Sequence, residues 1–244
     1  MAVVHLPELG ARSLPAAGET NTKTKVERVA EYLRESIIAG RFERGAKLKQ
    51  SELAMRFNIS PTPVREALKI LEAEGYVLGG SHRGAVVAPF DLQSAEEVVE
   101  LRGLLEGRLA LAAMRRMSED QLAKLVDLHT QLEQDVERGD RDSVRLNNFR
   151  FHHYLYSIAG QPQTLRFVHI LWARYPFDLI NRIEGRIAVT AKEHAAIVQA
   201  LVTKDEVGLL QAMNEHIHSG WRQLKTHIEQ DSSKAPETAP AGSS

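Results

Sequence analysis

The chain has 244 residues, enough for one large domain or two modest ones, and its 43% hydrophobic and 26% charged residues are typical of a soluble globular protein. It has no cysteine, which excludes disulfides and thiolate chemistry and favours a reducing, cytoplasmic compartment. No apolar run approaches the roughly 20 residues of a membrane helix, and the N-terminus lacks the apolar core of a signal peptide, so we expect no membrane partner.

The net charge of −1 is divided unevenly along the chain. Between Lys23 and Phe90, 12 Lys and Arg stand against 8 Glu and no Asp, a balance of +4, whereas the rest carries −5. A basic module joined to an acidic one predicts that only the first meets a polyanion. Chance scatter of surface charge is the alternative explanation.

The chain divides into four segments by composition. Residues 1–22 show no periodicity and residues 231–244 read DSSKAPETAPAGSS, so both are predicted to be disordered tails because they have little to bury. Residues 23–90 and 91–230 differ in their hydrophobic pattern, which predicts two folded domains.

The first domain has the pattern of a winged helix. Apolar residues at helical spacing predict three short helices, at residues 26–38, 51–57 and 62–74. Two runs of β-forming residues flank a Gly-rich turn and predict a two-stranded hairpin, at residues 76–78 and 85–88.

The second domain shows no convincing strand. Its predicted helices cover residues 94–117, 118–138, 141–159, 163–183, 188–202 and 204–229. Ser94 and Ser118 stand where they could cap the first two helices, and Pro176 could break the fourth. We therefore predict a mainly α protein, with an N-terminal winged helix-turn-helix followed by an all-α bundle of six or seven helices.

Residues 51–77, SELAMRFNISPTPVREALKILEAEGYV, place a short helix, a tight turn and a longer helix in succession. This geometry exposes the start of the second helix to the major groove of double-stranded DNA. Ser60, Thr62 and Arg65 lie at that start, where hydroxyls suit phosphates and Arg65 could reach a phosphate or a guanine edge. Arg83, at the hairpin tip, is placed to reach the minor groove or the backbone. A winged helix used only for protein docking is the alternative.

These residues resemble the DNA-binding domain of GntR-family regulators. The resemblance covers Val26 to Val87, and the TPVREAL core at residues 62–68 is highly specific to that family. In relatives the position of Pro61 is usually an arginine that touches DNA, which implies that Arg65 carries more of the readout in this chain. Arg44 also stands where the family often has proline.

Four residues of the second domain form a candidate metal site. Asn148 and His152 are four residues apart and share one helix face, and His194 and His216 lie on later helices. Three imidazoles with one oxygen donor would suit a divalent metal such as Zn²⁺, Ni²⁺ or Mn²⁺. Because the chain has 10 His, solvated or hydrogen-bonded core histidines are the alternative.

This domain resembles the FCD ligand-binding domain of the FadR-like subgroup of the GntR family. The resemblance covers Val98 to Leu224 and rests on NFRFH at 148–152, EH at 193–194 and AMNEHI at 212–217. In many members an aspartate and three histidines bind a metal, and a small carboxylate effector binds on or beside it. Asn148 stands at the aspartate position, which implies weaker metal binding. Direct binding of the effector by the same polar residues is the alternative.

Arg102 matches the position where FCD relatives commonly place an arginine that faces the pocket, and a guanidinium suits bidentate capture of a carboxylate. An ion pair with Glu106, four residues on, is the alternative. His153 and His218 point away from their histidine neighbours on an ideal helix, so we leave both out of the metal shell. Core packing is the expected role of Tyr175, and lining the pocket or a dimer surface is the alternative.

Together these features predict a cytoplasmic transcription regulator, not an enzyme. The commoner family behaviour implies a repressor that a metabolite releases, and activation is the alternative. A homodimer would place two recognition helices on a two-fold operator. Effector binding would change their spacing or mobility through the linker at residues 87–94, which contains Pro89.

A metal-dependent hydrolase that uses the three histidines is the rival function. The chain has no HExxH motif, and Glu193 and Glu215, which adjoin two of the histidines, are expected to point elsewhere on their helices. Protein docking alone is a third function. Gel-shift titration over a salt series separates DNA binding from both rivals.

Overall fold

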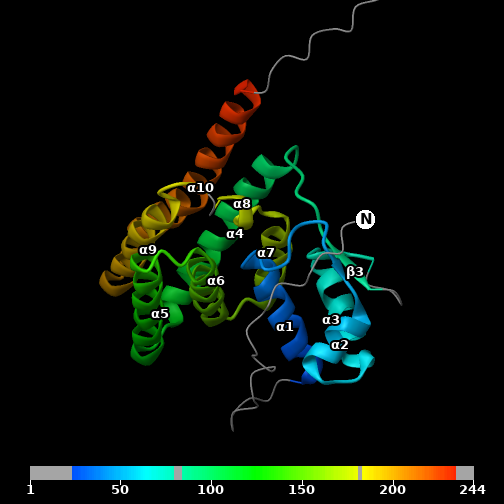
Figure 1. The fold of residues 1–244 in the computed structure, drawn as a ribbon. Helices are drawn as coiled ribbons and strands as arrows, with labels where there is room; N and C mark the ends of the chain where they lie inside the picture. The colour runs from blue at the N-terminus through cyan, green and yellow to red at the C-terminus, as the bar shows by residue number, and fades with distance from the viewer. Residues whose placement is uncertain (1–23, 80–83, 181–182, 235–244) are drawn as a thin grey trace, which may run out of the picture.

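The computed structural model describes residues 24–79, 84–180 and 183–234 (Figure 1). Its elements form two units, a small mixed one and a helical bundle, joined by residues 88–94. The predicted fold class, a winged helix-turn-helix followed by an all-α bundle, is confirmed. The last helix continues beyond residue 230 to Lys234, into the predicted C-terminal tail, because adding residues to an existing helix costs little.

The N-terminal unit contains α1 (Lys25–Ile38), β1 (Lys47–Leu48), α2 (Gln50–Phe57), α3 (Pro61–Ala73), β2 (Val77–Leu78) and β3 (Ala85–Val87). Its sheet has three antiparallel strands in the order β1-β3-β2, so the predicted hairpin, β2 with β3, is confirmed and β1 is an additional strand that was not predicted. The missed strand, β1, has only two residues, and it is defined by the pairing of Lys47 with Val86, which periodicity cannot reveal.

Local sequence explains where these helices begin and end. Thr24 and Glu27 form a capping box at the start of α1. Pro61 is the first residue of α3, where its missing N–H costs little. Asn58, with φ +51°, and Gly75, with φ +85°, adopt the left-handed conformation that ends α2 and α3.

The three helices bury their inner faces against one another and the sheet. Fully buried apolar side chains make this core, among them Val29, Leu33, Leu48, Leu53, Val64, Leu68 and Leu71. Helix α3 turns its apolar stripe inward, and its first residues lie at the surface.

Gly84, before β3, offers a test of this packing. Its φ is +104°, and a Cβ at this position would lie 2.4 Å from the carbonyl oxygen of Leu48. We expect Gly84→Ala to lower the free energy of unfolding by at least about 2 kcal/mol, since strained backbone alone costs roughly 1–3 kcal/mol. Gly79→Ala, at φ +70° with open space around it, is the control in urea denaturation. Equal losses in the two variants would contradict this account of the turn.

The bundle contains α4 (Ala95–Arg116), α5 (Glu119–Glu137), α6 (Arg141–Ile158), α7 (Pro162–Arg174), α8 (Phe177–Ile180), α9 (Arg186–Thr203) and α10 (Glu206–Lys234). The chain breaks between α7 and α8 at Pro176, as expected. Ser118 caps α5 with Gln121 in a capping box. Ser94 makes no side-chain cap, which corrects the prediction, because its hydroxyl donates to the carbonyl oxygen of Asp91 at 3.4 Å.

Helix α4 runs beside α10, and α5 and α9 complete the far side of the bundle (Figure 1). The winged unit rests on the bundle where α1 packs against α6. There Arg145 donates to the carbonyl oxygen of Ala39, and Arg150 pairs with Glu35 at 3.0 Å. None of the described helices has the length and apolar character needed to cross a bilayer.

Candidate functional site

The start of α3 is the exposed part of the helix-turn-helix. Ser60, Pro61 and Thr62 are exposed, and the side chain of Arg65 is 35% exposed. Gln50 donates to the carbonyl oxygen of Pro61 at 2.8 Å, which ties the start of α2 to the start of α3. Sequence reasoning missed this residue because the contact joins two separate helices.

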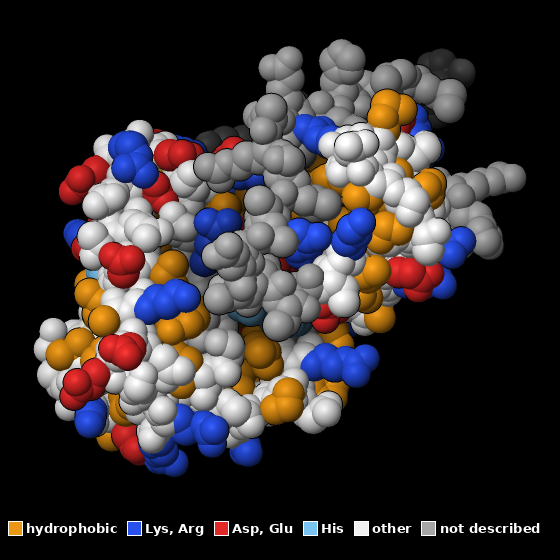
Figure 2. All heavy atoms as spheres, turned by 90° about the horizontal axis from the view of Figure 1, so that it is seen from below, with side chains coloured by type: hydrophobic (Ala, Val, Ile, Leu, Met, Phe, Trp, Pro, Cys, Tyr) orange, Lys and Arg blue, Asp and Glu red, His pale blue; other side chains and the backbone are white. Residues whose placement is uncertain are grey.

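The charges around α3 are consistent with a surface that meets an anion. Arg65 Nε lies 3.4 Å from the carboxylate of Glu66, which also lies 3.4 Å from Lys69 Nζ, so both cations are held loosely. In the face seen in Figure 2, carboxylates are more frequent over the bundle, at the left, than over the winged unit, at the right. Arg83, the fourth residue predicted to contact DNA, lies outside the described residues.

Three histidines from three helices converge inside the bundle. His152 lies on α6, His194 on α9 and His216 on α10, all are buried, and their candidate ligand atoms lie within 4.8 Å of one another. The Nε2 atoms of His152 and His216 face each other at 3.0 Å. His194 Nε2 lies 2.8 Å from Oδ1 of Asn148, the neutral amide of the predicted site.

Hydrogen bonds outside the cluster orient two of the rings. Tyr156 donates its hydroxyl to Glu106, so its oxygen is free to accept from His152 Nδ1, 3.1 Å away. Glu193 Oε2 accepts from His216 Nδ1 at 2.8 Å. Two imidazole nitrogens this close need a cation between them, either a proton on one Nε2 or a metal ion bound by both.

Burial and neighbouring charges set the protonation states of His152 and Glu193. Burial, followed by the charges of His216 and Arg102, lowers the pKa of His152 well below its usual range, so the ring is neutral. Burial alone would raise the pKa of Glu193, but the hydrogen bond and charge of His216, together with Arg186, outweigh it and lower the pKa to about 2. The ionised Glu193 can only accept, so the His216 proton stays on Nδ1.

The donor set fits a divalent metal. Two histidine nitrogens that bind one ion at about 2.1 Å lie about 3.0–3.4 Å apart, which is close to the separation of His152 and His216. Buried neutral imidazoles and an amide oxygen are ligands that Zn²⁺, Ni²⁺ and Mn²⁺ accept. His194 would have to move its proton to Nδ1, a buried atom that has no hydrogen-bond partner within the described ranges.

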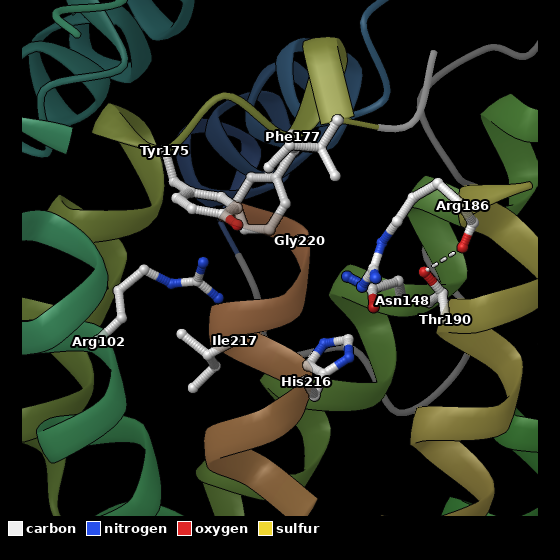
Figure 3. Close-up of a pocket in the computed structure, with 10 residues that line it drawn as sticks. Arg102, Asn148, Tyr175, Phe177, Arg186, Thr190, His216, Ile217 and Gly220 are labelled. Atoms are coloured by element: carbon white, nitrogen blue, oxygen red, sulfur yellow. Dashed lines mark hydrogen bonds between the residues drawn. The ribbon is translucent and has the colours of Figure 1, made fainter. Parts of the chain in front are cut away.

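A small cavity of about 30 Å³ opens beside the cluster (Figure 3). Its polar and aromatic lining includes Arg102, Asn148, Tyr175, Phe177, Arg186 and His216. Tyr175 therefore lines the cavity, which was the alternative role, and it is also buried in the core as expected. The sequence alone could not decide between these roles, because Tyr175 lies in the break between α7 and α8, where no helical pattern indicates which way a side chain points.

Arg102 forms the ion pair with Glu106 that was the alternative role, and it also lines the cavity. Its Nε donates to Glu106 Oε1 at 2.6 Å, and its guanidinium lies 4.0 Å from the centre of the Tyr175 ring. One of its two terminal nitrogens, Nη1, is buried and has no hydrogen-bond partner in the described part of the chain. An unpaired guanidinium N–H is costly to bury unless a ligand accepts from it.

Glu106 joins the arginine to the histidines. It is completely buried and accepts from Arg102, from Trp172 Nε1 at 2.9 Å and from Tyr156 at 2.8 Å. Tyr156 in turn contacts His152. The spacing of four residues within each helix pair, Arg102–Glu106 and His152–Tyr156, was a signal in the sequence that could have found this chain of contacts.

Glu193 is the clearest correction at the site. It was expected to point elsewhere on its helix, but its carboxylate contacts His216, Arg186 and Ser219. The expectation considered α9 alone, whereas α10 packs against α9 and places His216 Nδ1 next to Glu193. Glu215 pairs with Arg222 at the surface.

The two units define a class of protein before any comparison: a two-domain regulator with a helix-turn-helix and a helical domain around a polar cavity. A model for bacterial regulatory proteins of the gntR family matches residues 25–87, and a model for the FCD domain matches residues 97–219. The chain belongs to the GntR family of transcription regulators, in the group that carries an FCD domain.

Curated relatives agree with this assignment. The chain is 27% identical over 207 residues to the uncharacterized HTH-type transcriptional regulator BphR of Paraburkholderia xenovorans, with 82% of this chain and 84% of that protein covered. It is 26% identical over 217 residues to the gluconate operon transcriptional repressor of Bacillus subtilis, with 83% and 85% covered.

Solved structures support the fold alone. McbR of Escherichia coli superimposes with a TM-score of 0.74 at 24% identity, covering 84% of this chain and 99% of that one. A putative transcriptional regulator GntR from Rhodococcus sp. RHA1 gives a TM-score of 0.65 at 22% identity, with the same coverage.

Proposed function

We propose that this protein is a repressor that binds a double-stranded operator as a homodimer and changes its affinity when a small carboxylate and a divalent metal occupy the bundle cavity. The observation that carries the proposal is the convergence of three buried histidines and Asn148 on one cavity that Arg102 also lines. A domain with this cavity is attached to a DNA-binding unit, so occupancy can be linked to DNA binding.

His152, His194 and His216 would hold the metal through Nε2, with Asn148 Oδ1 as a neutral fourth donor. A bound Zn²⁺, Ni²⁺ or Mn²⁺ would supply a positive centre to which an effector oxygen can coordinate. Tyr156 and Glu193 would orient the rings of His152 and His216 toward the ion.

A carboxylate is the effector class that the cavity chemistry favours. Arg102 has an unpaired Nη1 in the cavity wall, and the guanidinium of Arg186 lies at the opposite side (Figure 3). Arg102 is paired with Glu106, and Arg186 with Glu193. Neither glutamate is among the described residues that line the cavity, so no carboxylate there would repel an anionic ligand. The gluconate operon named for one relative concerns a sugar acid, which supports the same class.

DNA binding by the start of α3 rests on exposure and charge. Ser60 and Thr62 are exposed beside backbone N–H groups of the first turn, and Arg65 can swing away from Glu66. Two copies related by a two-fold axis would present two such helices to successive major grooves. Repression agrees with the name of the Bacillus subtilis relative.

The first test is a gel-shift titration over a salt series, with a duplex selected by the purified protein. We expect affinity to fall linearly with the logarithm of salt concentration. Arg65→Ala should weaken binding by about 5- to 150-fold, which corresponds to roughly 1–3 kcal/mol. Arg222→Ala, an exposed arginine on α10, is the control and should bind like wild type. Failure to retard any duplex at low salt would contradict the proposed function.

A further inference from the structure

The segment from Tyr175 to Ile180 forms one wall of the cavity and also faces the winged unit. On one side, Tyr175, Phe177 and Ile180 line the cavity beside the histidines. On the other side, Tyr175, Phe177 and Asp178 line a space of about 10 Å³ against α1 residues Ile37 and Ile38. We call residues 175–180 the cavity wall.

Arg44 holds this wall from the winged unit. Its Nε lies 3.0 Å from Asp178 Oδ1, and its Nη2 donates to the carbonyl oxygen of Tyr175 at 2.9 Å. Its Nη1 donates to the carbonyl oxygen of Ala88, at the start of the linker, at 3.3 Å. The next residue, Gly45, donates its N–H to the carbonyl oxygen of Val87 at 2.9 Å, which ties the turn that carries Arg44 to β3.

Arg102 holds the same wall from inside the bundle. Its guanidinium lies 4.0 Å from the centre of the Tyr175 ring and 5.1 Å from that of Phe177, and the two rings meet edge to face at 4.7 Å. The wall thus lies between two arginines, one from each domain. A ligand that pairs with Arg102 in the cavity would therefore contact these rings.

The small size of the cavity favours movement of the wall when a ligand binds. About 30 Å³ accommodates roughly two water molecules, since one water needs about 10–15 Å³ measured in this way. An organic carboxylate is larger than two waters, and an octahedral ion that keeps two or three waters already fills the space. The wall contains the shortest helix that lines the cavity, the four-residue α8. We therefore expect the wall to be the part that moves.

We propose that Arg44 couples the cavity to the DNA-binding unit by clamping the cavity wall to the winged helix and the linker, and that cavity occupancy releases or shifts this clamp. The inference rests on the proposed function, since it assigns a path by which occupancy reaches DNA. This path is distinct from one that runs only through the linker at residues 87–94, because the clamp crosses directly from α8 to the turn before β1.

The test compares full-length wild type, Arg44→Ala and Arg150→Ala. Arg150 is the matched control, because it is also an arginine that joins the two units, through Glu35, but it does not contact the wall. Circular dichroism confirms that each variant is folded. If Arg44→Ala does not fold, Asp178→Asn removes the charged partner, keeps the shape of the side chain and should give a smaller effect of the same sign.

Hydrogen exchange without any ligand gives the first readout. The amides of Leu179 and Ile180 bond to the carbonyl oxygen of Pro176 at 3.1 Å, so their exchange reports opening of the wall. We expect exchange there to accelerate by about ten-fold or more in Arg44→Ala and to stay unchanged in Arg150→Ala. Unchanged exchange in Arg44→Ala, or equal acceleration in both variants, would overturn the proposal.

Ni²⁺ alone is the probe for coupling, with duplex affinity measured with and without the ion. We expect Ni²⁺ to change the duplex affinity of wild type and Arg150→Ala by about five-fold or more, and that of Arg44→Ala by less than two-fold. Uptake of Ni²⁺ by wild type without a change in duplex affinity would overturn the coupling. If no variant takes up Ni²⁺, the proposed metal site is wrong, and the exchange experiment still decides whether Arg44 clamps the wall.

Discussion

Replacing His152 by alanine is expected to lower the affinity of the protein for Zn²⁺ or Ni²⁺ by more than about a hundred-fold. The imidazole provides one of three converging Nε2 atoms, and losing a direct ligand should exceed the roughly 10- to 100-fold cost of losing an outer partner. Chelator competition at neutral pH measures the change, with metal content by mass spectrometry as a check.

His153→Ala is the matched control, because it removes the adjacent histidine of the same helix. Its ring stacks on His169 at 5.3 Å and is not among the converging donors. Metal affinity should be unchanged. If His152→Ala binds metal as tightly as His153→Ala, the cluster is a set of core histidines and the proposed metal is wrong.

Asn148→Asp tests the departure of this chain from the family pattern. A carboxylate adds a negative charge where Asn148 offers only a carbonyl oxygen, so metal affinity should rise by about ten-fold or more. Unchanged affinity would mean that residue 148 does not contact the metal. The effect should also disappear in a His152→Ala background, because the two side chains share one ion.

Replacing Glu106 is expected to destabilise the whole domain. Its carboxylate is completely buried and accepts from Arg102, Tyr156 and Trp172, so Glu106→Ala leaves a buried guanidinium without its ion-pair partner. Breaking a buried pair from one side costs about 3–5 kcal/mol. Urea denaturation, followed by helical circular dichroism, measures the loss.

Glu96→Ala is the control for the Glu106 experiment. Glu96 lies on the same helix and also forms an ion pair, with Lys225 at 2.7 Å, but both side chains are exposed. Exposed pairs contribute less than about 1 kcal/mol because water screens the charges. Similar losses in the two variants would show that burial of Glu106 is not what makes its ion pair important.

Much of the architecture could be predicted because its causes are local. The helices of the bundle begin and end within a few residues of the predicted positions, since apolar spacing, Ser118 and Pro176 act on their own neighbours. The helix-turn-helix was recognisable for the same reason. β1 was missed because two residues carry no periodicity, and only pairing with β3 makes them a strand.

The candidate site was predicted in part. The sequence indicated His152, His194 and His216 as residues that could meet, and Arg102 as a residue that either faces the pocket or pairs with Glu106. It did not indicate that Glu193 would orient His216, because that contact depends on how α9 crosses α10. Nor did it indicate that Glu106 and Tyr156 would connect the arginine to the cluster.

The amino-acid sequence alone therefore determined which helices form, which face of each is apolar and which histidines were available, because these depend on residues within a few positions of one another. Tertiary structure alone decided which polar atoms meet. Arg44 and Asp178 are 134 residues apart, yet they form an ion pair between the two units. Such contacts depend on the packing of whole helices, and small changes in that packing decide whether a polar atom finds a partner.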